Sequence, residues 1–344
     1  MSEITDFILQ LHITGNCNLR CRHCYVAEHC NNLSFSAIKR VVNQYGELIA
    51  QVEKRQGSRI RAHIHFTGGE PLLHPEINRI LRFFLKERRR FQFGIMSNGT
   101  VLRLRTLLLL KRLRLKAFQV SIDGDEVYHD TIRGKDNLRQ VLKGLDVLHF
   151  FRIPTRVSFT ANKENYEMFP KVAQICRKHH VRSLWSDRYI PFDKNSDLAP
   201  LTQSDMKKYV WVLQSEKENP LNGKSKLSVQ NYRALQFLSS GCDIYSCKAA
   251  ETMITVDEYG NIMPCRRLPI VCGNIRKTDL LSVYDCDETF KRFRLHRLNG
   301  KCVKCKYAET CRGGERCFTY AVEGNYENAD PCCWINSTED DFVC

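Results

Sequence analysis

Short apolar runs rich in β-branched residues alternate with longer amphipathic segments from residue 7 to about residue 192. Such runs are typical of buried strands, whereas apolar positions that recur every three to four residues are typical of helices. The pattern predicts strands over residues 7–13, 59–66, 91–97, 116–122, 154–160 and 184–190. It predicts helices near residues 35–55, 75–90, 101–114, 136–150, 164–180 and 202–217.

Strand–helix alternation of this kind indicates parallel βαβ units and therefore the α/β class. Six units are too few for a closed eight-stranded barrel, which takes about 250 residues. A partial, TIM-like (β/α)6 barrel is the better interpretation for residues 1–192.

The pattern changes after residue 192. Residues 193–241 are polar and contain prolines and glycines, so we interpret them as a bridging segment with a helix or two. Most of the seventeen cysteines follow residue 241, and the hydrophobic periodicity fades there. Residues 242–344 are therefore predicted to form a small cysteine-rich C-terminal domain that folds around metal. Within this domain, the order TMITV, EYGN and IMPC predicts a β-hairpin that delivers Cys265 after its turn.

The termini and the cysteine content narrow the cellular setting. The N-terminus carries no secretory signal, and no segment approaches the ~20 apolar residues of a membrane span. We therefore expect a cytoplasmic protein without a membrane partner. Thiols stay reduced in that compartment, so the cysteines are expected to ligate metal and not to form disulfides.

The formal net charge of +15 suggests acidic partners. Residues 79–116 alone hold twelve lysines and arginines against a single acidic residue, Glu87. Such a run is commonly a solvated helical face. Two functional interpretations stay open beside that one: docking of an acidic flavodoxin or ferredoxin reductant, and binding of an acidic peptide. Nucleic acid is disfavoured because no recognised binding motif accompanies the charge.

Three cysteines near the N-terminus, in the string CNLRCRHCY, carry the most specific chemical signal. Cys17, Cys21 and Cys24 place three thiolates on one short loop and offer no nearby fourth ligand. Structural zinc sites and iron–sulfur cubes normally take four protein ligands, so a triad leaves one metal position free. A zinc loop is the alternative, but zinc ribbons prefer paired CxxC knuckles. The triad resembles that of the radical S-adenosylmethionine (radical SAM) superfamily, in which SAM chelates the free iron.

The resemblance continues in the motifs at the ends of the predicted strands. Gly68, Gly69 and Glu70 follow the second strand and resemble the GGE motif that holds the amino group of SAM. A Gly-Gly turn is also common by itself. The resemblance implies further SAM-binding positions at Tyr25, Ser97, Asn98, Ser121, Asp123 and Arg133. Asn98 and Asp123 are equally well interpreted as turn residues, and Tyr25 as a packing aromatic.

The cysteine-rich half resembles the SPASM domain, which carries auxiliary iron–sulfur clusters in many radical SAM enzymes. This chain departs from the usual domain in one place. The usual domain has a Cx5Cx3C knuckle, whereas five residues separate Cys311 from Cys317 here. The resemblance implies one auxiliary cluster on Cys242, Cys247, Cys265 and Cys317, and another on Cys302, Cys305, Cys311 and Cys333. Cys332 competes with Cys333 for the last position, and the role of Cys344 stays open. A pair of zinc ribbons is the alternative for this domain.

Taken together, the resemblance implies three [4Fe–4S] clusters and SAM as cofactors. It implies reductive cleavage of SAM to a 5′-deoxyadenosyl radical, which abstracts hydrogen from a C–H bond. The expected outcome is oxidative modification of a ribosomally made peptide or a protein, by a crosslink or a related maturation. The short segment before the first strand predicts a separate leader-binding protein or direct binding. Arg266 follows Cys265, where sulfatase-maturing relatives typically carry an aspartate base.

Two other functions stay open. Haem-forming relatives with a similar CRGG region act on tetrapyrrole side chains, and a non-enzymatic zinc-binding module is the third interpretation. The sequence identifies no catalytic acid or base, no substrate and no oligomeric state.

Overall fold

The computed structural model describes residues 4–25, 30–192, 196–239 and 244–335. Ten strands form one sheet in the order β10-β9-β8-β1-β2-β3-β4-β5-β6-β7. Within it, each of β1 to β6 pairs in parallel with the next strand along the chain. These six strands are β1 (Thr5–Thr14), β2 (Ile60–Gly68), β3 (Gln92–Met96), β4 (Ala117–Ser121), β5 (Thr155–Ala161) and β6 (Ser183–Arg188). The parallel α/β barrel expected from the alternating pattern is confirmed.

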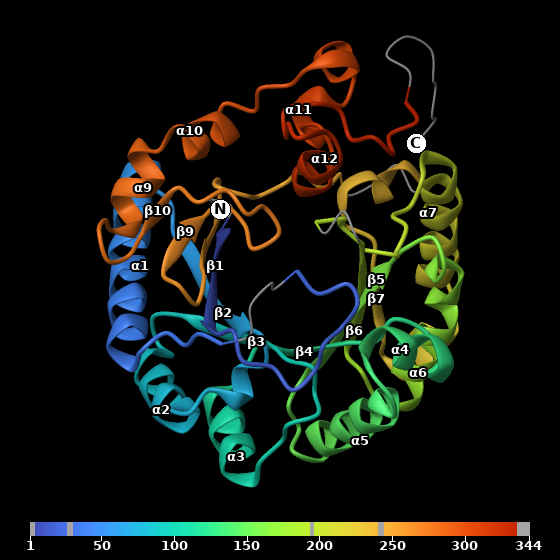
Figure 1. The fold of residues 1–344 in the computed structure, drawn as a ribbon, viewed down its shortest axis with the longest axis horizontal. Helices are drawn as coiled ribbons and strands as arrows, with labels where there is room; N and C mark the ends of the chain where they lie inside the picture. Colours follow the sequence, from blue (N-terminus) through green and yellow to red (C-terminus); the bar gives the residue numbers. More distant parts are fainter. Residues whose placement is uncertain (1–3, 26–29, 193–195, 240–243, 336–344) are drawn as a thin grey trace.

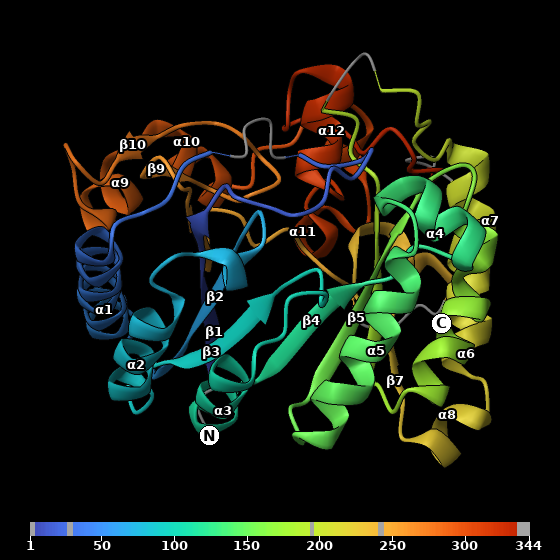
Figure 2. The same ribbon diagram turned by 60° about the horizontal axis from the view of Figure 1, so that its bottom comes forward.

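Helices cover the outer side of these strands (Figures 1 and 2). They are α1 (Phe35–Gln56), α2 (Ile77–Glu87), α3 (Leu104–Leu113), α4 (Glu126–Arg133), α5 (Asn137–Phe150), α6 (Phe169–Lys178) and α7 (Gln203–Lys217). The first helix shows how the local sequence sets the ends of a helix and the face that packs on the sheet. Ser34 caps its N-terminus by accepting from the backbone N–H of Ala37, and Gly57 ends it in the left-handed conformation. One face of α1 is buried, and the hydroxyl of Tyr45 on that face donates to the carbonyl of Phe7 on β1.

The later part of the chain extends the same sheet at both edges. From the bridging segment, β7 (Ser228–Gln230) pairs in parallel with β6. From the cysteine-rich segment, β8 (Met253–Val256) pairs in parallel with β1 and turns into β9 (Asn261–Met263), which confirms the predicted hairpin. A two-residue strand, β10 (Gly273–Asn274), follows. The division at residues 192 and 241 stays a prediction.

Short helices complete the chain. In Figure 1 the orange and red C-terminal elements close the side of the ring between α1 and α7. A continuous hydrophobic core runs from the barrel into this region, and it includes Phe290 and Phe318. No helix among the described residues is long and apolar enough to cross a membrane. The remaining elements are α8 (Leu221–Ser225), α9 (Leu280–Cys286), α10 (Glu288–Arg294), α11 (Ala308–Cys311), α12 (Arg316–Glu323), η1 (Pro71–Leu73), η2 (Tyr166–Met168), η3 (Ala234–Ser239) and η4 (Gly300–Lys304).

Candidate functional site

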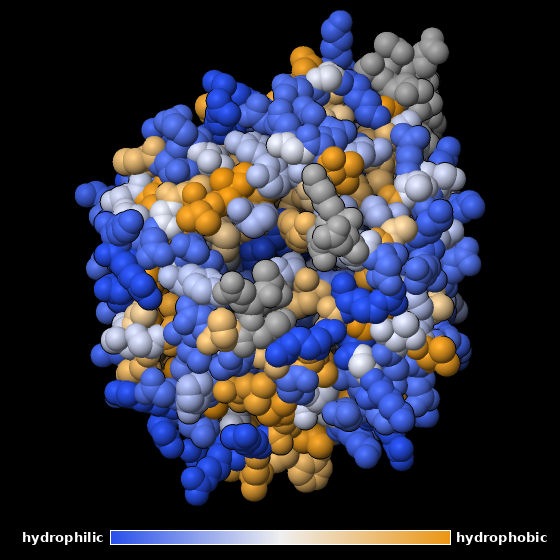
Figure 3. Space-filling model, in the orientation of Figure 1, coloured by the Kyte–Doolittle hydropathy of each residue, from blue (hydrophilic) through white to orange (hydrophobic). Residues whose placement is uncertain are grey.

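A cavity of about 200 Å³ lies at the carboxyl ends of the parallel strands. Ligands gather at this end of α/β barrels, because the strand-to-helix loops meet there. Figure 3 shows the molecule hollowed near its centre. The cavity wall includes residues at the ends of β2 to β6, the loop after β1, and two arginines that follow the β8–β9 hairpin. Both halves of the chain therefore build one site.

The thiols of Cys17, Cys21 and Cys24 all line this cavity. Cys17 is half-buried and accepts from the backbone N–H of Leu19 at 3.4 Å and from the side-chain amide of Asn98 at 3.9 Å. Burial raises the pKa of the Cys17 thiol, and the two donors oppose that rise. Among the described residues that line the cavity, no fourth cysteine occurs. The structure therefore brings together three sulfur donors beside open space.

Gly68 and Gly69 line the cavity because the chain passes very close to the end of β1 there. A Cβ atom on Gly68 would overlap the carbonyl oxygen of Thr14, and Gly68 has a φ of +131°. A Cβ atom on Gly69 would lie 2.5 Å from the carbonyl oxygen of Asn16. Only glycine allows both approaches. The two glycines thus join the loop that carries Cys17 to the end of β2.

Glu70, the third residue of the GGE motif, lies behind the cavity wall and is fully buried. Its carboxylate accepts from the hydroxyl of Ser97 at 2.9 Å and from the backbone N–H groups of Leu72 and Asn98 at 2.9 and 2.7 Å. Burial raises the pKa of Glu70 to about 7 against these hydrogen bonds. Glu70 therefore fixes the loop after β3, which holds Ser97 and Asn98 against the cavity.

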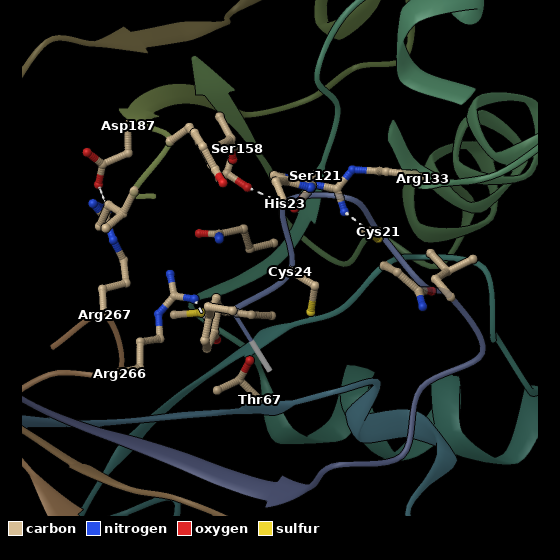
Figure 4. Close-up of a pocket in the computed structure, with 18 of the residues that line it drawn as sticks. Cys21, His23, Cys24, Thr67, Ser121, Arg133, Ser158, Asp187, Arg266 and Arg267 are labelled. Carbon is tan, nitrogen blue, oxygen red and sulfur yellow. Dashed lines mark hydrogen bonds and ion pairs between the residues drawn. The ribbon is translucent and has the colours of Figure 1, made fainter. Parts of the chain in front are cut away.

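Arg133 reaches the three-cysteine loop from the end of α4. Its Nε donates to the carboxylate of Asp123 at 2.6 Å, and its terminal nitrogens lie 3.8 Å from the sulfur of Cys21 and 3.1 Å from Nε2 of His23. Burial opposes its charge, but Asp123 and Cys21 outweigh burial and raise the pKa of Arg133. Asp123 is buried behind the wall, and despite its burial Arg133 and His23 hold its pKa well below the usual range. Asp123 therefore orients the arginine, whose side chain points toward Cys21 in Figure 4.

Ser121 and Tyr25 complete the expected set and also line the cavity. The hydroxyl of Ser121 lies 3.1 Å from that of Ser158 on the next strand. The hydroxyl of Tyr25 accepts from Arg266 at 3.0 Å, and the Arg266 guanidinium lies over the Tyr25 ring. Tyr25 thus links the three-cysteine loop to the C-terminal half. Seven of the nine expected SAM-binding residues line the cavity, and Glu70 and Asp123 support it from behind.

The opposite wall contains charged residues that the sequence reasoning missed. Asp187 and Arg188 end β6, and Arg267 comes from beyond the hairpin. Arg267 pairs with both Asp187 and Glu315. Arg188 is buried and donates to Glu315 at 2.9 Å and to Asp330 at 2.6 Å. The only available signal was the charged pair in the middle of the predicted strand over residues 184–190, whose other residues are mostly apolar.

Cys247, Cys265 and Cys317 line a second, smaller cavity of about 50 Å³. Arg266 and Arg267 border both this cavity and the first one. Cys317 was expected to be a ligand although the knuckle spacing is altered. The structure brings it together with two of its expected partners, Cys247 and Cys265. Burial, together with the neighbouring Cys265, raises the pKa of Cys247 to about 11. Cys242, the expected fourth member, lies outside the described residues.

Cys302, Cys305, Cys311 and Cys333 line a third cavity of about 20 Å³. Cys332 does not line it; its thiol instead donates to the carbonyl of Leu201 at 3.1 Å. Cys344 lies outside the described residues. In the described part of the chain, no three histidine, cysteine or carboxylate side chains converge on a position for a single ion. Each cysteine group lines a cavity instead, and all-cysteine donor sets suit iron–sulfur clusters.

Comparison with known proteins agrees with this arrangement. The chain matches the family model of the radical SAM superfamily over residues 11–176. It matches the model of the SPASM iron–sulfur cluster-binding domain over residues 247–317.

Proteins similar over most of the chain include the AdoMet-dependent heme synthase of Methanosarcina barkeri, 25% identical over 95% of both chains. The subtilosin biosynthesis protein AlbA of Bacillus subtilis is 24% identical over 98% of this chain and 74% of its own.

Two solved structures share the fold at 17% identity. SuiB of Streptococcus suis bound to S-adenosylmethionine has a TM-score of 0.74, over 96% of this chain and 78% of its own. The enzyme anSMEcpe with bound AdoMet and peptide has a TM-score of 0.75, over 95% of this chain and 94% of its own. The protein is therefore a member of the radical SAM enzymes that carry a C-terminal SPASM domain.

Proposed function

We propose that this enzyme cleaves SAM reductively at Cys17, Cys21 and Cys24 and oxidatively modifies a peptide or protein substrate. One observation carries the proposal: three thiols, the Gly68–Gly69 turn and Arg133 border a single cavity at the carboxyl ends of the strands. When bound there, a [4Fe–4S] cluster and SAM would supply the 5′-deoxyadenosyl radical that removes a hydrogen atom from the substrate.

The residues around the cavity have separable roles in this proposal. Cys17, Cys21 and Cys24 would hold the cluster by three of its corners. Arg133, oriented by Asp123, brings its terminal N–H donors to the three-cysteine loop, where they suit a carboxylate such as that of SAM. Ser97 and Asn98, fixed by Glu70, and Ser121 would contact SAM along the wall. Arg266 and Arg267 cover the cavity on the C-terminal side and help to exclude water.

The other two cysteine groups would hold auxiliary [4Fe–4S] clusters. The first group is Cys242, Cys247, Cys265 and Cys317, and the second is Cys302, Cys305, Cys311 and Cys333. The preference for Cys333 over Cys332 rests on the cavity that Cys333 lines and Cys332 does not. The first group adjoins the main cavity across Arg267, which suits electron exchange with the substrate.

A peptide is the favoured substrate because similar proteins handle peptides. SuiB has been solved with its precursor peptide SuiA, anSMEcpe with a bound peptide, and AlbA takes part in bacteriocin biosynthesis. We propose that this enzyme binds its peptide directly or with a separate leader-binding protein. The proposal includes a cytoplasmic location, because every described cysteine is a free thiol. It also includes a flavodoxin or ferredoxin reductant, because reductive cleavage of SAM takes an external electron.

Tetrapyrrole side-chain modification is the second candidate. Arg266 lines the cavity and, among the described residues, forms no ion pair with a carboxylate, so it is suited to a carboxylate on the substrate. The similar heme synthase of Methanosarcina barkeri also matches this chain over 95% of both lengths. A porphyrin that co-purifies with the enzyme would favour this candidate, whereas a mass change in a precursor peptide would favour the first.

The test is anaerobic reconstitution with iron and sulfide, followed by incubation with SAM and dithionite. Mass spectrometry should detect 5′-deoxyadenosine, and Cys21→Ala should abolish it while iron at the other two groups remains. Cys286→Ala is the matched control, because Cys286 is exposed on α9 and lines none of the three cavities. Absence of 5′-deoxyadenosine from the reconstituted wild-type enzyme would contradict the proposal.

A further inference from the structure

The outer side of α2 and α3 is a strongly basic surface. We define the α2–α3 face by its exposed members: Arg79, Arg82, Lys86, Arg88, Arg89, Arg90, Arg103, Leu104, Arg105, Leu108, Lys111, Arg112, Arg114 and Lys116. Among the described residues, only two of its twelve cations form ion pairs, Arg79 with Glu76 and Arg90 with Glu87. The face therefore presents an excess of unmatched positive charge to solvent.

Apolar side chains lie within this charge. Leu104 and Leu108 occupy successive turns of α3 and are 63% and 44% exposed. Arg105 and Lys111 flank them on the same helix, and hydrophobic residues gather over α3 at the bottom of Figure 3. The two exposed leucines and the cations around them form an apolar patch with a charged rim. Such a patch is typical of a protein-docking surface.

One end of the α2–α3 face adjoins the three-cysteine loop. The side chain of Asn98 contacts the sulfur of Cys17, and it also donates to Asn18 at 2.8 Å. Asn18 in turn donates to Thr100 at 2.9 Å. Only three residues separate Thr100 from Leu104, where α3 begins. Leu104 and Arg105 are thus at the end of the face that is nearest to the thiols.

We propose that the α2–α3 face docks a small acidic one-electron carrier protein, of the flavodoxin or ferredoxin class, whose electron enters at the three-cysteine site. The proposal rests on the proposed function, since that site needs an external electron. The carrier's cofactor loses one electron and the three-cysteine site gains it, with no atom transferred. No residue of α2 or α3 lines the main cavity in the described part of the chain, so a docked carrier leaves the cavity to SAM and substrate.

The test compares two charge-reversal variants of the reconstituted enzyme. Arg103→Glu with Arg105→Glu alters the near end of the face, and Lys207→Glu with Lys208→Glu makes the same charge change on exposed residues of α7. Chemically reduced flavodoxin is the electron donor, and 5′-deoxyadenosine is measured without substrate. Calorimetry measures flavodoxin binding independently of turnover.

The near-end variant should lower the flavodoxin-driven rate and the affinity for flavodoxin about tenfold or more, because steering by charge contributes at least that factor. In the α7 variant, the flavodoxin-driven rate and the affinity for flavodoxin should change less than twofold. Dithionite-driven cleavage should stay at the wild-type rate in the near-end variant and in the α7 variant. Raising the ionic strength should weaken wild-type binding more than that of the near-end variant.

Equal effects in the two variants, or none in either, would overturn the proposal. Loss of binding to a polyglutamate peptide or an RNA oligonucleotide, with flavodoxin binding intact, would also overturn it and assign the face to that ligand. Failure of dithionite to drive cleavage contradicts the proposed function instead, and the calorimetric comparison then still decides whether flavodoxin docks on this face.

Discussion

Neighbouring cysteines near the C-terminus show how much depends on the direction of one side chain. Cys333 lines the cavity shared with Cys302, Cys305 and Cys311, whereas Cys332 is buried beside Leu201. The sequence could not separate the two, because adjacent cysteines have the same spacing to every other ligand within one residue.

Cys333→Ala should therefore lower the iron content of the reconstituted enzyme by about four atoms per chain, the content of one cubane cluster. Cys332→Ala removes only a buried thiol and should leave the iron content unchanged. Iron analysis after anaerobic reconstitution measures both. Equal iron loss from the two variants would show that the described geometry does not determine the ligand.

Glu70 predicts a pH dependence of stability. Its pKa is about 7 in the folded protein and ordinarily 4.5, so between these values the folded chain retains a proton that the unfolded chain has lost. The contribution of Glu70 to the free energy of unfolding should therefore fall by on the order of 3 kcal/mol as the pH rises from about 4.5 to about 7. Glu70→Gln should lack this component. Unfolding of both proteins at pH 5 and pH 8 measures it, and an equal pH dependence in the variant would contradict this account.

At the scale of elements, the junction between β1 and β2 has the tightest backbone approach around the site. Gly69→Ala should destabilise the protein by about 1–3 kcal/mol, because the new methyl meets the backbone of Gly15 and Asn16, which cannot move aside like a side chain. Gly223→Ala is the matched control, since its Cβ meets nothing within 4 Å. Thermal unfolding should separate the two variants. Equal stability would mean that the β1 loop shifts freely.

The elements that the sequence predicted are those whose own residues determine them. All six barrel strands and six of the barrel helices lie where the periodicity placed them, because each buries a regular apolar face. The helix α4 was missed because its eight residues bury only His129 and Ile132 and show no long apolar repeat. The edge strand β7 is only three residues long, and the pairing of the four-residue strand β8 with β1 depends on residues far away in the chain.

The whole molecule is joined by the buried ion pairs of Arg188, Glu315, Asp330 and their neighbours. They connect β6 of the barrel to the residues that flank α12. The sequence could indicate the cysteines and the SAM motifs, which are local patterns, but not this network, in which Arg188 and its carboxylate partners lie more than 120 residues apart. Charged residues are ordinarily expected at the surface, and only the packed structure shows that these are buried.

Asp330→Asn should lower the free energy of unfolding by about 3 kcal/mol, because it leaves the buried Arg188 with one carboxylate partner instead of two. Asp285→Asn, which breaks the exposed pair with Arg55, should have little effect. Denaturant unfolding of variants with matched iron content measures the difference. A similar small effect of both substitutions would show that the network contributes little to joining the two halves.

The pairing of β8 with β1 has a consequence for biosynthesis. A ribosome adds about 5–20 residues per second, so roughly ten to fifty seconds pass between the emergence of Thr14 and that of Val256. During that interval the hydrogen-bonding groups on one side of β1 have no strand beside them, and a nascent chain with an unprotected strand edge is prone to aggregate. Efficient production of this enzyme should therefore benefit from chaperones that shield the newborn polypeptide until β8 has been made.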